Sequence, residues 1–476
     1  MSPAPRTSFG ASESTRLHTP PLLTGRIAEL LAGKKIAMTG VTGFIGEQML
    51  WKFLTECPDT TTAVLVRRKG SLSATQRVAS LLKKKKIFKD LVAGAGSVEK
   101  LMADRIEVIE GDLPDAPELP RDIDVLVHCA GDVSFDPPID AAFKTNVLGV
   151  KALLRRFRES CSDENGNLVR VPHYVHISTA YTAGRRRGPI PEAAHPHEVD
   201  YEAETRAALA MTDLVEARSR TSEQLTALRK EAEKLHRRAG YLTTSEDTER
   251  RRLEWVKQEL VAAGTERARS LGWTDVYTFA KAMGEAVVAD LCRDMQVSIV
   301  RPAIVESSLK YPYPGWIEGF KMADPIILAY GRGQLPEFPA SPDAVIDIIP
   351  CDYVVNTIVA VCATQPKVGE PEFYHCSSGA RNPLTFRGIY EHIRSYFSRH
   401  PYRDGQGSHQ LATWNFPGPE PVERKLWFAE KGVAIGNRLL GFAPRGKRTR
   451  AAARVLDKTA KQLDFLNRYL SLYGEY

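Results

Sequence analysis

Tyr277 and Lys281 lie four residues apart in the segment "DVYTFAKAMGE", which begins at Asp275. On an α-helix, residues at this spacing share one face, so the phenol and the ammonium would lie side by side. Such a pair can protonate an oxygen that has just received a hydride, because the ammonium stabilises the phenolate and lowers the pKa of the phenol. Many helices carry the same pair on a partly buried face without any chemistry. The elements around the pair must therefore decide between the two interpretations.

A glycine-rich turn stands near the start of the chain, in "KIAMTGVTGFIG" at 35–46. A short apolar run, three glycines and the helix-like "EQMLWKFL" predict a strand, a tight turn and a helix, as in dinucleotide-binding folds. The glycines let the backbone approach a pyrophosphate, and the helix N-terminus favours an anion. The spacing is G-x-x-G-x-x-G. We expect cofactor contacts from Thr39, Gly40, Thr42, Gly43, Phe44, Ile45 and Gly46.

The second expected strand, "AVLVRR" at 63–68, ends in Arg67 and Arg68. A fold that prefers NAD places an acidic residue here, where it bonds the ribose 2′-hydroxyl. A guanidinium instead suits a 2′-phosphate, by its charge and its bidentate geometry. Exposed arginines without a ligand are the other interpretation. The position favours NADPH as the cofactor.

Further strands are expected at 105–113, 124–133, 173–184 and 297–305, with helices between them. This alternation predicts an α/β protein with a doubly wound, Rossmann-type parallel sheet, in which ligands sit at the carboxyl ends of the strands. Asp112 and Leu113 would flank the adenine there, and Thr179 would face the reactive ring of the cofactor. Other cofactor-binding candidates near these strand ends are Ala130, Gly131, Asn146, Ser178, Pro302 and Ile304.

The segments "TGVTGFIG", "GDL", "HCAGDVSF", "TNVLG", "ISTAYTAG" and "YTFAK" occur in the order typical of extended short-chain dehydrogenases/reductases, which the sequence resembles. More narrowly, it resembles the fatty acyl-CoA reductases. That likeness rests on "LVRRKGSLSATQRV", "VRPAIVESSLKYPYPGWIEGF", "DIIPCDYVVNTIVA" and "YHCSSGARNPLTF". It is dense over residues 30–395 and looser towards "DFLNRYLSLYGEY". Nucleotide-sugar epimerases share the early motifs but lack "PYPGWIEGF" and "RNPLTF".

The resemblance implies a catalytic triad of Thr179, Tyr277 and Lys281, with Ser178 as the alternative hydroxyl. It also implies NADPH-dependent reduction of a long-chain fatty acyl-CoA to a fatty alcohol through an aldehyde. Alternatives within this fold are a reductase that stops at the aldehyde, or one that acts on a free aldehyde, a carrier-protein thioester or a nucleotide sugar. An alternative from another class is a non-catalytic NADP-binding scaffold.

Nearly a hundred residues separate Thr179 from Tyr277, more than in compact relatives. The extra segment, about 200–272, contains no proline and has apolar residues at helical spacing, so it predicts two or three long helices. A helical hairpin packed on the core, a binding or oligomerisation arm and a lid over an acyl channel all remain open. The insertion does not separate the triad in space.

The expected domain organisation has four parts: a disordered leader over 1–30, a reductase domain over 31–400, a polar linker over 401–422 and a helical region over 423–476. We expect this last region to be a shortened or truncated domain. Within the reductase domain, Trp316 and Phe320 are candidates for contact with an acyl tail, with core packing as the alternative. The basic "APRGKRTR" in the last part allows contact with phosphates or anionic lipid.

Composition excludes several classes of protein. The net charge of +7 is mild, and the basic clusters "KKKK" and "RRR" lack the aromatic residues of a nucleic-acid site. Seven scattered cysteines without a C-x-x-C pair predict reduced thiols, and "HPH" at 195–197 has no evident partner ligands, so no metal is expected. No apolar run reaches the roughly 18 residues of a membrane span. We expect a cytoplasmic protein, with room for peripheral membrane contact and for a homo-oligomer.

Overall fold

The computed structural model describes residues 26–416 apart from 135, 187, 236–240, 320–322, 334, 336, 339, 405–406, 409–410 and 412, and also Arg424 and Lys431. Its centre is a seven-stranded sheet in the order β10-β6-β5-β4-β1-β2-β3, in which every pair of neighbours is parallel. The strand order reverses between β1 and β4, which confirms the doubly wound α/β prediction. The strands are β1 Lys35–Thr39, β2 Thr61–Val66, β3 Ile106–Glu110, β4 Val125–His128, β5 His173–Ile177, β6 Gln296–Pro302 and β10 Glu372–Cys376.

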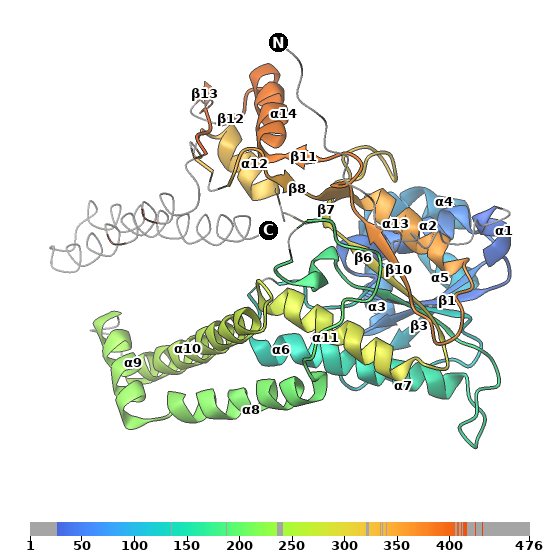
Figure 1. Ribbon diagram of the computed structural model, residues 1–476, viewed down its shortest axis with the longest axis horizontal. Coiled ribbons are helices and arrows are strands. Elements are labelled where there is room, and N and C mark those ends of the chain that lie inside the picture. The colour runs from blue at the N-terminus through green and yellow to red at the C-terminus, as the bar shows by residue number, and fades with distance from the viewer. Residues whose placement is uncertain are drawn as a thin grey trace, which may run out of the picture.

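Alternate residues of each strand belong to two different cores, because successive side chains of a strand point to opposite faces. In β1, Ile36 and Met38 join the core on one face, whereas Ala37 joins the core on the other. The first core is covered by α1 Ile27–Leu31, α2 Phe44–Glu56, α3 Ala74–Lys84, α4 Lys89–Ala95, α5 Val98–Arg105 and α13 Cys351–Cys362. The second is covered by α6 Ile139–Phe143, the π-helical turn η2 Lys144–Leu148, α7 Gly149–Ser160 and α11 Val276–Leu291 (Figure 1).

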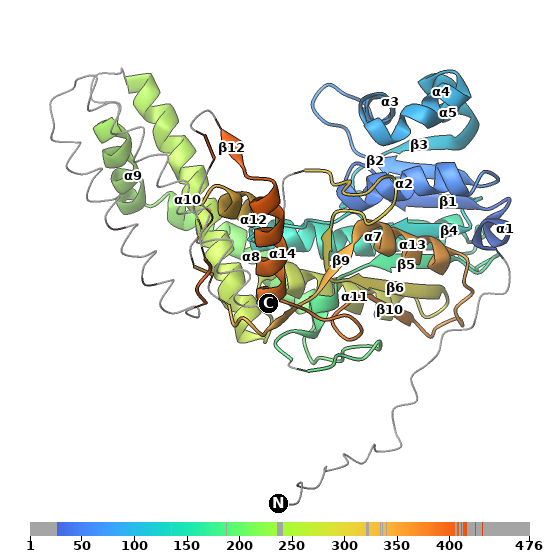
Figure 2. The same cartoon turned by 90° about the horizontal axis from the view of Figure 1, so that it is seen from above.

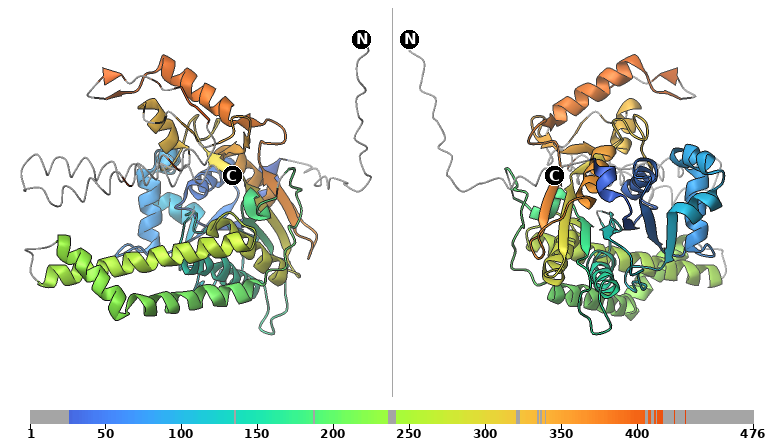
Figure 3. Two further views of the ribbon diagram at one scale, coloured as in Figure 1. Left: turned by 60° about the vertical axis from the view of Figure 1, so that its left-hand side comes forward. Right: turned by 90° about the vertical axis from the view of Figure 1, so that its right-hand side faces the viewer.

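The insertion between β5 and α11 forms three helices, α8 Tyr201–Ser219, α9 Ser222–Leu235 and α10 Tyr241–Ser270. They project from the sheet as an arm, with α8 and α10 alongside each other and α9 at the far end (Figures 1 and 3). The arm packs on the body through residues of α8 and α10, among them Ala208 and Ala268, which belong to the same core as α6 and α11. The helical prediction for 200–272 is therefore confirmed, and the arm is packed against the body where it joins it.

A smaller body lies beyond the carboxyl ends of the strands, on the side of the sheet away from α1 (Figure 2). Its core holds aromatic residues from segments far apart in the sequence, among them Tyr330, Phe338, Tyr390 and Trp414. Its elements are β7 Ile304–Glu306, α12 Asp324–Gly331, β8 Val345–Ile346, β9 Ile348–Pro350, β11 Leu384–Thr385, α14 Phe386–Arg399, β12 Arg403–Asp404 and β13 Gly407–Ser408.

Two expected boundaries differ from the structure. Helix α1 begins at Ile27 and buries Leu31 in the first core, so the end of the expected leader is structured. The expected linker contributes Trp414, which is 5% exposed and packs in the smaller body. The proline- and glycine-rich composition predicted a linker here, because one tryptophan can fix a segment by packing without giving its sequence any periodicity. The expected helical region over 423–476 lies outside the described residues, apart from Arg424 and Lys431.

Candidate active site

The turn between β1 and α2 has the backbone that a phosphate needs. Gly40 has φ +79°, and a Cβ there would lie 2.7 Å from the nitrogen of Ala130. A Cβ at Gly46 would lie 2.1 Å from the carbonyl oxygen of Gly40, so only glycine lets α2 start this close to β1. Gly43 precedes α2 without any side-chain cap. The first N–H groups of α2, at Phe44 and Ile45, therefore face the turn where Thr42 is exposed, as a dinucleotide pyrophosphate requires.

Strand β4 is tied to this turn by Thr39, whose buried hydroxyl accepts a hydrogen bond from the Ala130 N–H at 3.0 Å. Next along the chain, a Cβ on Gly131 would lie 2.9 Å from Asn146 Oδ1 and 3.2 Å from Lys281 Nζ. Asn146 sits in the π-helical turn η2 and exchanges hydrogen bonds with the backbone of Asp132, at 3.0 and 3.1 Å. Asn146 therefore joins η2 to the segment that follows β4.

The structure brings Thr179, Tyr277 and Lys281 together at the carboxyl ends of β5 and β6. The hydroxyl of Thr179 is hydrogen-bonded to that of Tyr277, and it also approaches the carbonyl of Pro302 at 3.4 Å. Lys281 is 6% exposed, and its ammonium donates to the carbonyl of Ile177 at 2.9 Å. Helix α11 aims both residues at this edge because Asp275 caps it, accepting from the Thr278 N–H at 2.8 Å.

The protonation of the pair differs from the sequence-based expectation. Burial raises the pKa of Tyr277 above its ordinary value, and the Asp275 carboxylate raises it further, against a smaller lowering by the Thr179 hydrogen bond. Burial also lowers the pKa of Lys281. The expected lowering of the Tyr277 pKa by Lys281 is wrong for this structure, because the ammonium is directed at a backbone carbonyl and the phenol is poorly solvated. The phenol is consequently held in its protonated, proton-donating form.

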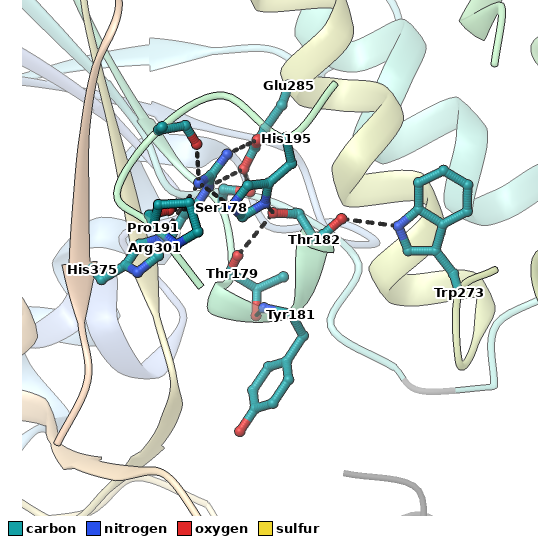
Figure 4. A network of polar contacts seen from close by, with 11 residues as sticks. Ser178, Thr179, Tyr181, Thr182, Pro191, His195, Trp273, Glu285, Arg301 and His375 are labelled. Carbon is teal, nitrogen blue, oxygen red and sulfur yellow. Dashed lines mark hydrogen bonds and ion pairs between the residues drawn. The ribbon is translucent and has the colours of Figure 1, made fainter. Parts of the chain in front are cut away.

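Ser178 points to a different partner from its neighbour. Its hydroxyl donates to Glu285 Oε1 at 2.5 Å. Both carboxylate oxygens of Glu285 accept from the fully buried Arg301, from Nε at 3.0 Å and from Nη2 at 2.7 Å (Figure 4). Arg301 also meets the carbonyl of Ala193 at 2.7 Å and the ring of His195 at 3.2 Å. The histidines of "HPH" are therefore engaged within the protein, since His195 binds this network and His197 packs on Trp273.

Sequence reasoning missed this Glu285–Arg301 network. Two signals were present: Glu285 follows Lys281 by four residues on the same helix face, and Arg301 is a charge inside an apolar strand. A charge at such a position must be paired when buried. The network links α11, β6 and the end of β5, which are the elements that carry the triad.

The two arginines at the end of β2 form ion pairs that the sequence did not predict. Arg68 pairs with Glu110 at 2.6 Å, and Glu110 also accepts from the Ala74 N–H at 2.8 Å. Arg67 is more loosely placed, 3.6 Å from Asp112, with both side chains more than half exposed. Leu113, next to Asp112, is buried. Arg67 is thus the more available of the two guanidiniums.

The remaining candidates fall in three different places. Pro302 ends β6 beside Thr179, whereas the side chain of Ile304 belongs to the core of the smaller body. Trp316 is 3% exposed and stacks on Phe44 with ring centroids 5.2 Å apart, so the core-packing alternative describes it. Phe320 lies outside the described residues. All seven cysteines are free thiols, as expected.

Known proteins resemble this chain in sequence and in fold. Residues 38–358 match the family model NAD_binding_4, described as male sterility protein. Fatty acyl-CoA reductase 2, chloroplastic, of Arabidopsis thaliana is 31% identical over 398 residues, covering 80% of this chain and 60% of that protein. The alcohol-forming fatty acyl-CoA reductase of Simmondsia chinensis is 30% identical over 395 residues, covering 79% of this chain and 73% of that protein.

Among solved structures, the terminal R domain of the myxalamid PKS-NRPS pathway aligns over 92% of this chain and 91% of its own, with a TM-score of 0.50 and 16% identity. At that identity the likeness concerns the fold alone, an extended Rossmann domain with a second body. The sequence matches go further, because the family model covers most of the sheet, the glycine turn and the helix that carries Tyr277 and Lys281. The chain belongs to the fatty acyl-CoA reductase family, enzymes of the extended short-chain dehydrogenase/reductase type that use a nicotinamide dinucleotide.

Proposed function

We propose that the chain catalyses NADPH-dependent reduction of a long-chain fatty acyl-CoA to a fatty alcohol, through the aldehyde. The observation that carries this proposal is the hydrogen-bonded pair of Thr179 and Tyr277, placed with Lys281 at the strand ends that the glycine turn also faces. The family supplies the class of substrate. The chain spans 60% to 73% of the length of the two relatives described, so the activity of the whole protein is part of the proposal.

The residues present fit a bound dinucleotide, since the glycine turn leaves open the space that a Cβ would fill. Bound NADPH would supply the hydride. Thr179 and Tyr277 then act on the substrate: both hydroxyls donate to the carbonyl oxygen, which becomes negative as the carbonyl carbon is reduced. Tyr277 transfers its proton to that oxygen, and Lys281 stabilises the phenolate left behind once it turns from the Ile177 carbonyl.

The reduced thioester is a hemithioacetal, which breaks its carbon–sulfur bond to release the thiol and an aldehyde. A second reduction of that aldehyde, with a second proton from Tyr277, gives the alcohol. Because both reductions need the same donors at one carbonyl oxygen, a single site suffices for the two steps. Each alcohol formed should therefore consume two NADPH and release one thiol.

Purified protein mixed with NADPH and a series of acyl-CoAs tests the proposal through absorbance loss, thiol release and product chromatography. We expect two NADPH per thiol; a ratio of one would show that the enzyme stops at the aldehyde. Tyr277→Phe should lower turnover by at least about a hundredfold, the usual contribution of general acid catalysis, while still binding NADPH. Tyr353→Phe, at an exposed tyrosine, is the matched control. Full activity of Tyr277→Phe, or no NADPH consumption with any acyl-CoA, would overturn the proposal and favour the scaffold alternative.

The preference for NADPH over NADH follows from Arg67 and Arg68, which we assign to the 2′-phosphate. Because Arg68 is held by Glu110, Arg67→Ala should reduce the preference more than Arg68→Ala does. Glu110→Gln weakens the hold on Arg68 and should increase the preference, as measured by the ratio of kcat/KM for the two cofactors. Equal ratios in the wild type and in the Arg67→Ala/Arg68→Ala double variant would refute the assignment.

A further inference from the structure

Exposed hydrophobic side chains gather on the loop after β7 and the first turn of α13. Leu309 is 50% exposed, Tyr311 49%, Tyr313 39% and Tyr353 50%. We call these four residues the tyrosine face. Scattered exposed hydrophobics are normal on a protein, but a contiguous group marks an interaction surface.

The backbone beneath the tyrosine face is firmly held. Asp352 is 3% exposed, and its carboxylate accepts hydrogen bonds from the N–H groups of Leu309, Lys310 and Tyr311, at 2.9, 2.9 and 3.2 Å. The buried amide of Gln48 donates to the Tyr311 carbonyl from below. The side chains are thus presented to solvent by a fixed scaffold, and their exposure does not come from a loose loop.

Lysines surround the face. The ammonium of Lys52 lies 5.4 Å from the Tyr311 ring centre, and that of Lys86 lies 4.9 Å from the Tyr313 ring centre. Carboxylates neutralise some neighbours: Glu56 pairs with Lys52, while Glu47 and Glu318 pair with Lys85. Two other lysines at this face, Lys86 and Lys310, form no ion pair within the described part of the chain. The charged groups that lie against the tyrosine rings are therefore positive.

A cleft of about 620 Å³ opens at the same place, between α2, α4, α5 and the loop. Its apolar walls include Trp51, Leu54, Leu91 and Leu101, and Tyr313 and Lys86 also line it. Acidic groups are present too, since Asp90 and Asp104 are among the lining residues. An apolar cleft bordered by an aromatic ring and an ammonium suits an alkyl chain beneath an anionic headgroup better than it suits an acidic peptide.

We propose that the tyrosine face and its lysines seat the protein on an anionic lipid bilayer. Tyrosine rings favour the level of the headgroups, because one end of the ring is apolar and the other is polar. Lysines beside them gain from the negative surface potential of the bilayer. The inference is independent of the proposed reaction, since none of these residues belongs to the triad or to the dinucleotide site. It assigns membrane contact to the Rossmann body, whereas the sequence had pointed to the basic segment 445–450.

Sedimentation of the full chain with vesicles tests the proposal, using phosphatidylcholine alone and phosphatidylcholine mixed with phosphatidylserine. We expect strong binding only to the mixed vesicles, weakened by salt. The triple variant Leu309→Ser/Tyr311→Ser/Tyr313→Ser should lose at least about tenfold in partition coefficient. The matched control is Leu214→Ser/Leu225→Ser/Leu253→Ser, at three exposed leucines of the arm. Changing Lys86 and Lys310 together to Gln should abolish the preference for phosphatidylserine.

A second measurement does not depend on how the triple variant folds. An environment-sensitive fluorophore on Leu309→Cys should shift to the blue with mixed vesicles, whereas the same label on Leu214→Cys should not. The native thiols are buried except for the partly buried Cys129, so a labelled wild type gives the background. The proposal would be overturned by no blue shift at position 309 or by unchanged binding of the triple variant. It would also be overturned if only changes at 445–450 abolished binding, or if the protein bound polyglutamate but not vesicles.

Discussion

Arg301 is a buried cation whose charge is balanced by one carboxylate. Breaking such a pair by removing one partner leaves an uncompensated charge, which costs about 3–5 kcal/mol. Glu285→Gln keeps the shape and the contact with Ser178 but removes the negative charge. We therefore expect the free energy of unfolding to fall by about 3 kcal/mol in urea titrations.

Glu285→Gln also tests the role of this ion pair in the active site. Because Glu285 joins α11 to the end of β5, its loss should lower kcat more than it raises KM. Ser178→Ala, which leaves the ion pair intact, should cost only about 1 kcal/mol and serves as the comparison. A Glu285→Gln protein as stable as the wild type would show that Arg301 finds another partner.

How far the sequence predicted the site differs from residue to residue. The glycine turn and the Tyr277/Lys281 pair were readable because local spacing determines the backbone and the helix face, whereas Thr179 was added to that pair by the family resemblance. The pKa of Tyr277 was not, since it depends on how water is excluded by packed neighbours. Nor was Glu110 readable as the partner of Arg68, because that contact joins adjacent strands across a long stretch of sequence.

Among the elements, α12 begins beside a partly buried carboxyl group. Glu306 of β7 accepts the N–H of Ala323 at 2.8 Å, and burial raises the pKa of Glu306 to about 7. The folded protein thus binds this proton more tightly than the unfolded chain does, so stability falls as pH rises from about 4.5 to about 7.

Glu306→Gln keeps an oxygen for the Ala323 N–H and removes the titration. Relative to the wild type, the variant should gain stability as pH rises through that window, by at most about 3.5 kcal/mol at about 1.4 kcal/mol per pKa unit. Urea unfolding of both proteins at about pH 5, 6 and 7 measures this difference in stability. Glu99→Gln, at an exposed position, should show no such trend, and a pH-independent difference for Glu306→Gln would contradict the assignment.

Element by element, the first six strands and the helical insertion were predictable, because apolar runs and helical periodicity are local signals. Strand β10 was not predicted. Its sequence, "EFYHC", is short and contains the polar residues Glu372 and His375, and it becomes a strand by pairing with β6. The helix after β4 is interrupted in a way that periodicity does not reveal, since α6 begins at Ile139 and continues through the π-helical turn η2 into α7.

At the scale of the whole molecule, Trp414 ties a late segment into the smaller body. Its ring stacks on Phe338 with centroids 4.9 Å apart and on Tyr390 with centroids 5.5 Å apart. Replacing a buried large aromatic residue with alanine costs about 3–5 kcal/mol. We expect Trp414→Ala to lose about that much stability in calorimetry or urea unfolding. Tyr396→Ala, at an exposed ring on α14, should change stability little; equal effects would mean that the segment does not anchor the body.

The two ends of the arm meet at its base. The N–H of Arg185 donates to the carbonyl of Gly272 at 2.9 Å, and Glu204 of α8 pairs with Arg267 of α10. The chain therefore leaves the body and returns to almost the same point, so the length of the arm does not move the ends of β5 and α11 apart. The residues of α8 and α10 that pack with α11 belong to the core and have to stay. Evolution and protein engineering can treat the part of the arm beyond them as an interchangeable module, which can be lengthened, shortened or exchanged while the distance from Thr179 to Tyr277 stays the same.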